Sequence, residues 1–288
     1  MIDLVCTIDE NYVPHCAAML ASVMENTKSQ LNVYIIHDGI NSKKLKKLTG
    51  FVEERGHTAT GLMCDIDMLM GAPVTDHISL ATYFRLLIPK LLPQSCRKVL
   101  FLDSDIVVPG NIDELYRTDV SQHPLAAVHH GFPDKMTQAN LGFLPNESYF
   151  NAGVMLINLS HWRDIDFTSQ ALSFVAENPD KIQFWDQDVL NFFFKNKWLR
   201  IDPTWNSMRY FFDLTPGQLQ EMGYSRIEIE SITKENKIIH FTGAEKPWVR
   251  GSKHLHRKIY LTYLKKTPFR PTNPIERSLM YISNEILR

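Results

Sequence analysis

The sequence lacks the features that mark membrane-spanning and disulfide-bonded secreted proteins. No apolar run approaches the roughly 18 residues that a membrane-spanning helix needs. The N-terminus, beginning at Met1, has neither the basic start nor the cleavage site of a signal peptide, so we expect a cytoplasmic protein. The four cysteines form no Cys-x-x-Cys pair and lie in or beside apolar segments, which predicts reduced, buried thiols.

An excess of charge of one sign is also missing. The chain has 31 Lys and Arg residues against 32 Asp and Glu residues, a formal net charge of -1. Such a balance gives no indication of a surface for nucleic acid or another polyanion. With 288 residues, 44% of them hydrophobic, the chain can form one large domain with a sizeable core.

Short apolar runs alternate along the chain with segments of helix-like spacing. Residues 15–25 have that spacing, Ser42 is expected to cap the next helix, and residues 185–191 open a later one. Runs of strand character cover six ranges: 2–8, 31–37, 99–102, 125–129, 154–159 and 238–241. Strands alternating with helices predict an α/β fold with a mostly parallel central sheet and helices on both faces.

The C-terminal residues 265–288 differ in composition from the rest. Three prolines within 267–274 predict a linker. Four apolar residues then share one helix face: Ile275, Leu279, Ile282 and Ile286. With five basic and two acidic side chains, this tail is either a helix packed on the main domain or a basic amphipathic segment resting on the inner face of the cell membrane.

A pair of carboxylates follows the apolar run at 99–102. Alternate residues of a strand point to the same side, so Asp103 and Asp105 can converge on one cation. Open α/β sheets bind ligands at the carboxyl ends of their strands. Oxygen ligands suit Mg²⁺ or Mn²⁺, and such an ion can bridge a diphosphate. Three other Asp-x-Asp triplets lack the preceding strong strand: 65/67, 164/166 and 186/188.

The same segment fits a second chemistry. Haloacid-dehalogenase-type phosphatases place Asp-x-Asp-x-Val after an apolar strand, which 103–107 matches, and Asp103 would then be a nucleophile. Against this, about 100 residues precede the motif, and the chain has no Gly-Asp dipeptide for that family's later metal motif.

Further segments complete an ordered pattern along the chain. They are Val5 to Tyr12, Thr82 to Arg85, Asn151-Ala152-Gly153, Trp185-Asp186-Gln187-Asp188, and His240 followed by Gly243 and Lys246-Pro247-Trp248. Together with Asp103 and Asp105 they resemble glycosyltransferase family 8, specifically the bacterial lipopolysaccharide-type galactosyl- and glucosyltransferases. The resemblance extends over residues 5–248.

This resemblance implies a GT-A fold over residues 1–264, in which a Rossmann-like nucleotide-binding half is merged with an acceptor-binding half. Asp103, Asp105 and His240 match the family positions that bind Mn²⁺, with Mg²⁺ as the alternative. An imidazole beside two carboxylates is chemically suited to Mn²⁺.

A larger set matches the family's site for the donor, UDP-galactose or UDP-glucose. Its members are Thr7, Asp9, Asn11 and Tyr12 at the uracil and ribose, Ser104 between the metal ligands, Gly243 and Lys246 over the diphosphate, and Arg85, Asn151, Ala152, Asp186 and Gln187 around the sugar. The catalytic candidates come from the same region: Arg85, Asp186, Gln187 and Asp188.

The resemblance also implies retention of the anomeric configuration. A covalent route would need a carboxylate nucleophile, and the matched position holds Gln187, whose amide is a poor one. We therefore favour attack of the acceptor hydroxyl on the face of the leaving group. Asp186 would orient sugar hydroxyls, and Asp188 is the alternative covalent participant.

Residues 129–148 match the family pattern least, and in the family this region helps to form the acceptor side. We therefore expect only a carbohydrate acceptor, free or lipid-linked, in lipopolysaccharide or other surface-glycan biosynthesis. Two other classes stay open: the phosphatase using Asp103 and Asp105, and a sugar-binding module without turnover.

Overall fold

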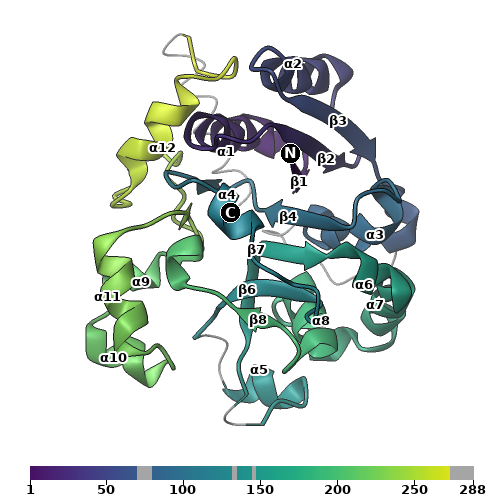
Figure 1. Cartoon of the computed structure of the whole chain (residues 1–288), viewed down its shortest axis with the longest axis vertical. Coiled ribbons are helices and arrows are strands. Elements are labelled where there is room, and N and C mark those ends of the chain that lie inside the picture. Colours follow the sequence, from purple (N-terminus) through teal and green to yellow (C-terminus); the bar gives the residue numbers. More distant parts are fainter. Residues whose placement is uncertain (70–79, 132–134, 145–146, 273–288) are drawn as a thin grey trace.

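The computed structural model describes residues 1–69, 80–131, 135–144 and 147–272. Within them a seven-stranded sheet has the order β3-β2-β1-β4-β7-β6-β8 (Figure 1). Its strands are β1 (Ile2–Ile8), β2 (Leu31–His37), β3 (Thr58–Met63), β4 (Lys98–Leu102), β6 (Leu125–His129), β7 (Phe150–Asn158) and β8 (Leu199–Arg200). Strand β7 is antiparallel to both of its neighbours, and the other pairs are parallel. The expected mostly parallel sheet is confirmed.

Alternate residues of the central strands enter two separate cores. Leu4 and Cys6 of β1 belong to the core on one face of the sheet, and Val5 belongs to the core on the other. Leu100 and Phe101 of β4 divide in the same way. Because both faces are buried, these strands appear in the sequence as continuous apolar runs.

Helices cover both faces of the sheet. The first core includes residues of α1 (Val13–Asn26), α2 (Ser42–Glu53) and α12 (Arg257–Leu264). The second includes residues of α3 (Ile88–Leu91), α6 (Leu159–Asp164), α7 (Phe167–Glu177) and α8 (Trp185–Phe194). The helical layers expected on the two faces are therefore present.

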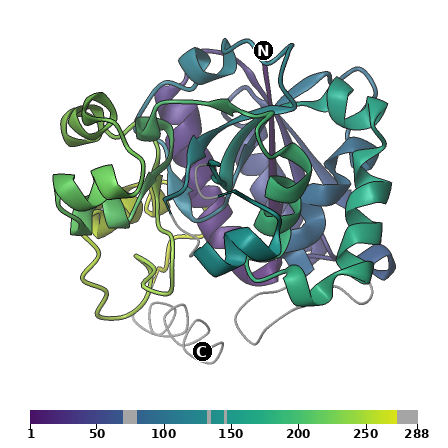
Figure 2. The ribbon, with the colours of Figure 1, turned by 90° about the horizontal axis from the view of Figure 1, so that it is seen from below.

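A second, smaller sheet lies beside the main one. In it β10 (Ile239–His240) is antiparallel to β5 (Ile106–Val107) and parallel to β9 (Ser207–Met208). The helices α9 (Tyr210–Asp213), α10 (Pro216–Glu221) and α11 (Arg226–Lys234) form a lobe on this side (Figure 2). The small sheet matters for function because it brings a late segment of the chain to the end of β4.

The remaining elements are short. They are the helices α4 (Asp113–Tyr116) and α5 (Lys135–Asn140) and the 3-10 helices η1 (Glu10–Tyr12), η2 (Ile66–Leu69), η3 (Leu80–Leu87), η4 (Pro179–Lys181) and η5 (Pro203–Asn206).

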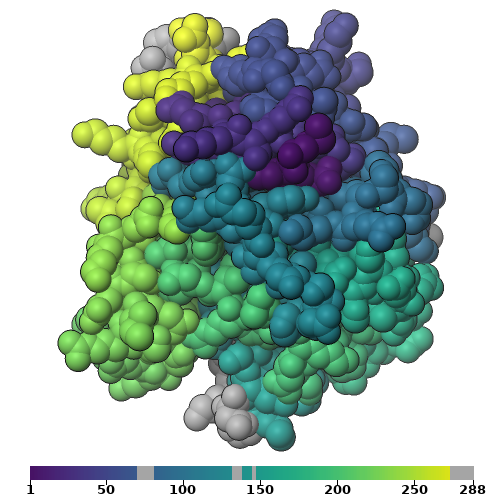
Figure 3. Space-filling model, in the orientation of Figure 1, coloured from purple at the N-terminus to yellow at the C-terminus, as the bar shows by residue number. Residues whose placement is uncertain are grey.

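Helix α12 packs against the first helix of the chain. In Figure 3 the yellow C-terminal segment lies directly beside the purple N-terminal one. The Asn26 side-chain amide donates to the Tyr263 hydroxyl at 2.9 Å, and His15 Nδ1 lies 2.6 Å from the Tyr260 hydroxyl. These contacts fasten α12 to α1, the helix that follows β1.

Several sequence expectations need correction. Asn41, not Ser42, caps α2, because its side-chain oxygen accepts from the Lys43 amide at 3.0 Å. The late strand expected at 238–241 shrinks to the two residues of β10. Strand β3 was not expected. The predicted apolar face of the tail lies outside the described residues.

The cysteine and membrane expectations can also be compared with the structure. All four cysteines are free and buried, as expected. Among the described residues, no helix has the length and apolar character required to cross a bilayer.

Candidate active site

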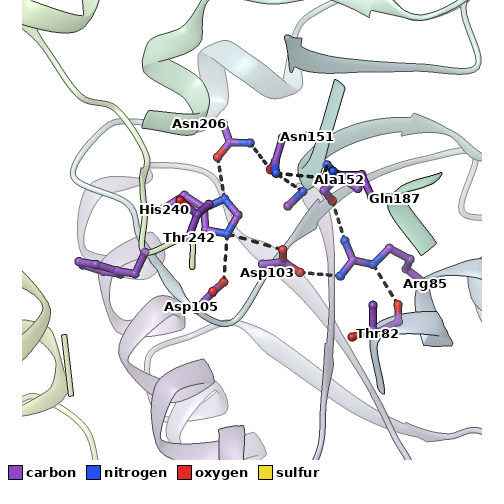
Figure 4. A network of polar contacts seen from close by, with 12 residues as sticks. Thr82, Arg85, Asp103, Asp105, Asn151, Ala152, Gln187, Asn206, His240 and Thr242 are labelled. Carbon is purple, nitrogen blue, oxygen red and sulfur yellow. Dashed lines mark hydrogen bonds and ion pairs between the residues drawn. The ribbon is translucent and has the colours of Figure 1, made fainter. Parts of the chain in front are cut away.

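Two carboxylates and an imidazole meet at the carboxyl end of β4. Asp103 follows β4, Asp105 precedes β5, and His240 ends β10. His240 Nε2 lies 3.2 Å from Asp105 Oδ1 and 3.8 Å from Asp103 Oδ2 (Figure 4). One ligand atom from each residue lies within 4.8 Å of the others. The structure thus brings together the three residues predicted to hold a metal ion, and their donor set fits Mn²⁺ or Mg²⁺.

Lysine and arginine side chains compensate these carboxylates. Lys246 Nζ lies 2.5 Å from Asp105 Oδ2. Burial alone would raise the pKa of Asp105, but the Lys246 charge and the His240 ring outweigh it and hold this pKa below its usual range. For Asp103, burial raises the pKa even though Arg85 opposes the rise. The positive charges near Asp103 therefore do not fully offset the cost of burying its carboxylate.

Arg85 is a buried hub and not a surface residue. Its Nη2 lies 2.9 Å from Asp103 Oδ1, and its Nε lies 2.7 Å from Asp186 Oδ2. Nη1 donates to the Ala152 carbonyl at 2.8 Å, and the guanidinium lies over the Phe101 ring. Burial raises the pKa of Asp186 to about 7 despite the adjacent Arg85. Arg85 thereby links Asp103, one of the predicted metal ligands, to the start of α8.

Asn151, Ala152 and Gln187 form one hydrogen-bonded unit beside this hub. The Gln187 side-chain oxygen accepts from Asn151 Nδ2 and from the Ala152 amide, both at 3.0 Å. Its amide nitrogen donates to the Tyr149 hydroxyl at 3.2 Å. The structure thus places these predicted sugar-site residues together at the beginning of β7 and α8.

Asp188 is fully buried and is connected to this unit through the Tyr149 hydroxyl. Its Oδ1 accepts from the Tyr149 hydroxyl at 2.7 Å. Its Oδ2 accepts from the backbone amides of Gln183 and Phe184 at 2.7 and 2.6 Å. These bonds close the turn that leads into α8, which is a structural task.

The predicted nucleotide turn lies at the end of β1. Asp9 Oδ1 accepts from the amides of Asn11 and Tyr12 at 2.8 and 3.1 Å, which folds the turn of η1. The Tyr12 ring meets Trp248 edge-on at 5.9 Å between ring centroids. Thr7, two residues before Asp9, is buried. Ser104, between Asp103 and Asp105, is also buried.

The loop after β10 is anchored to that turn through His15. The Trp248 ring stacks on His15 at 3.7 Å between centroids. Burial lowers the pKa of His15 to about 3, so this imidazole is neutral at physiological pH. Within the loop, Gly243 has φ +80°, a conformation that favours glycine, and Lys246 Nζ donates to the Phe241 carbonyl at 2.7 Å. The anchored loop holds Lys246 over Asp105.

Three residues of the site were missed in the sequence. Asn206 is fully buried, and its Oδ1 lies 2.9 Å from His240 Nδ1. Tyr149 contacts Gln187 and Asp188, and His130 Nδ1 lies 3.4 Å from Gln187 Nε2. Their segments carry no distinctive motif. The available signal was a polar residue next to buried apolar ones.

Comparison with known proteins gives a consistent result. The family model described as "Glycosyl transferase family 8" matches residues 3–251. "General stress protein A" of Bacillus subtilis (strain 168) is 29% identical over 93% of this chain and 94% of its own length. The "Lipopolysaccharide 1,2-glucosyltransferase" of Escherichia coli (strain K12) is 28% identical over 93% of this chain and 78% of its own length.

Solved structures share the fold. The crystal structure of the galactosyltransferase LgtC in complex with donor and acceptor sugar analogs has a TM-score of 0.85 and covers 96% of this chain and 100% of its own. At 24% sequence identity, this likeness shows the GT-A fold.

The buried ion pairs of Arg85 predict a large effect on stability. We expect Arg85→Met to lower the free energy of unfolding by about 3–5 kcal/mol, because it leaves the buried carboxylate of Asp186 and the half-buried carboxylate of Asp103 without their partner. Arg226 is the control, because its side chain is 85% exposed in its pair with Glu230. Arg226→Met should change the free energy of unfolding by less than about 1 kcal/mol. Urea unfolding measures both, and equal losses would contradict the assigned role.

Gly153 leaves room for two of the predicted metal ligands, His240 and Asp103, which gives a second prediction. A Cβ there would collide with the His240 ring and come within 2.7 Å of Asp103 Oδ2. Gly153→Ala should therefore weaken Mn²⁺ binding by about tenfold or more. In α2, Gly50 has nothing within 4 Å of an added Cβ, so Gly50→Ala is the matched control. Spin-resonance titration of free Mn²⁺ measures both, and unchanged binding in Gly153→Ala would refute this reasoning.

Proposed function

The chain belongs to glycosyl transferase family 8, and from this premise we propose that it is a retaining, Mn²⁺-dependent hexosyltransferase. It moves galactose or glucose from a UDP-sugar to a carbohydrate acceptor. The observation that carries the proposal is the convergence of Asp103, Asp105 and His240 beside Lys246.

The diphosphate of the donor would lie at this cluster. A bound Mn²⁺ would act there as a Lewis acid toward the leaving UDP. Asp103, Asp105 and His240 would hold the ion, and the Lys246 ammonium would move from Asp105 to contact phosphate oxygens. Tyr12 and the turn shaped by Asp9 would hold the uracil and ribose.

The hydrogen-bonded unit beside the cluster would receive the sugar. Arg85 and Asp186 would orient its hydroxyls, and Asn151, Ala152 and Gln187 would form the wall behind it. An acceptor hydroxyl would attack from the face of the leaving group and pass its proton to the leaving diphosphate oxygen. The buried position of Asp188 supports this front-face route over a covalent one.

The names of two relatives suggest the biological setting. One is a lipopolysaccharide 1,2-glucosyltransferase of Escherichia coli, and another is a lipopolysaccharide 1,3-galactosyltransferase of Salmonella typhimurium, 27% identical over 84% of this chain. We propose a role in the assembly of a surface glycan, on the cytoplasmic side of the membrane, with UDP-galactose and UDP-glucose as the two donors to be compared. The family match argues against the phosphatase interpretation of Asp103 and Asp105.

Release of UDP from UDP-galactose or UDP-glucose tests the activity. We expect Mn²⁺-dependent turnover that falls by on the order of 100-fold or more in Asp103→Ala and Asp105→Ala, because the charge on the leaving group loses its stabilisation. His240→Ala should weaken Mn²⁺ binding more than uridine binding. Asp164→Ala, which alters an exposed Asp-x-Asp triplet, should behave as the wild type.

Three outcomes of that assay would count against the proposal. Full turnover in excess chelator would remove the metal dependence. Binding of UDP-sugar without turnover would indicate a binding module, and release of phosphate from simple monoesters without any nucleotide requirement would revive the phosphatase.

The front-face route predicts that no covalent intermediate accumulates. Intact-protein mass spectrometry during turnover should show no addition of a hexosyl unit. Asp188→Asn should lower the free energy of unfolding by about 1–3 kcal/mol, since the turn before α8 loses a charged acceptor, and should leave kcat within about tenfold of wild type. A trapped hexosyl adduct on any side chain would overturn this route.

A further inference from the structure

Four polar side chains form a continuous hydrogen-bonded chain from the sugar side of the site to the metal ligands. In order they are Gln187, Asn151, Asn206 and His240 (Figure 4). Asn151, Asn206 and His240 are each at most 7% exposed. Because each amide has one donor end and one acceptor end, the direction of the whole chain is set once the ends of a single amide are fixed.

Two backbone amides fix those ends independently. The Gly153 N–H donates to Asn151 Oδ1 at 3.0 Å, so the atom at that point must be an oxygen. The Ala152 N–H donates to Gln187 Oε1 at 3.0 Å, which leaves Asn151 Nδ2 as the donor to that same oxygen. Both constraints give Asn151 the same orientation.

The orientation of Asn206 then follows. Asn151 Oδ1 can only accept, so the Asn206 atom 2.8 Å from it is the donor Nδ2. Asn206 therefore turns its Oδ1 toward His240 Nδ1, at 2.9 Å. Since that oxygen also can only accept, Nδ1 must carry a hydrogen, and Nε2 is the ring nitrogen that faces the point where Asp103 and Asp105 converge.

We propose that Asn206 is a positioning residue that holds the His240 ring with its hydrogen on Nδ1, so that Nε2 is presented as a metal ligand. This inference rests on the metal dependence in the proposed function. In a metal-binding histidine, the hydrogen-bond partner of the ring nitrogen that does not bind the metal sets the orientation and the basicity of the ring. Here that partner is the neutral carboxamide of Asn206, the last residue of η5.

Two substitutions at this position separate the histidine contact from the asparagine contact. Asn206→Leu removes both and should weaken Mn²⁺ binding by about 10- to 100-fold. Asn206→Asp keeps an acceptor for His240 and loses the donor to Asn151, so it should bind Mn²⁺ within about threefold of wild type.

Asn191→Leu is the matched control. Asn191 is equally buried, and it bonds the amide and carbonyl of Phe150 and the backbone carbonyl of Gln187, without a bond to His240. It should lower thermal stability but leave Mn²⁺ affinity close to wild type. If Asn191→Leu loses affinity as Asn206→Leu does, the effect is general destabilisation, and the proposed role of Asn206 fails.

The ring state gives a readout that does not depend on activity. Nitrogen-15 NMR of the histidines with diamagnetic Mg²⁺ bound should show the His240 hydrogen on Nδ1 in wild type and Asn206→Asp, and a loss of that state in Asn206→Leu. A hydrogen on Nε2 in the wild type, or wild-type Mn²⁺ affinity in Asn206→Leu, would overturn the role of Asn206 and leave the proposed function unaffected. Absence of any Mn²⁺ binding by the wild type would instead remove the metal dependence itself.

Discussion

The site depends on one pairing, that of β10 with β5, which delivers His240 to Asp103 and Asp105. In the antiparallel register His240 lies opposite Ile106, one residue after Asp105. The imidazole can approach the carboxylates only because Gly153 leaves the space free. A contact between residues so distant in the chain closes a long loop, and its entropic cost is offset by the apolar packing that surrounds the small sheet.

Burial makes the charges around this pairing interdependent. Asp103, Asp105 and Asp186 compete for the cations of Arg85 and Lys246. Burial raises the pKa of Asp103 and of Asp186 despite those cations, so the cations do not fully offset the cost of burying these two carboxylates. A divalent ion held by Asp103 and Asp105 would offset part of that cost and free the ammonium of Lys246 for an anionic ligand.

The sequence predicted the parts of this structure that depend on local pattern. Strands β1, β2 and β6 have the expected bounds because continuous apolar runs mark strands buried on both faces. Strand β3 was missed since its residues are largely exposed or half-buried. The strands of the small sheet have two residues each, too few to show the alternation of apolar and polar side chains from which a strand is predicted. From its sequence position alone, Arg85 would be expected in an ion pair at the surface. Only tertiary packing buries it between Asp103 and Asp186.

Asn206 shows why the residues that support a site are harder to predict than the residues that form it. Its two hydrogen-bond partners are 34 and 55 positions away, and no spacing connects the three residues. The hydrogen-bonded chain that Asn206 completes ends at Gln187, whose possible role as a nucleophile it also affects. Gln187 Oε1 already accepts from Asn151 and Ala152, so the one nucleophilic atom of that side chain is occupied in the wall of the proposed sugar site. The same hydrogen bonds that orient the proposed metal ligand His240 therefore argue against covalent catalysis by Gln187.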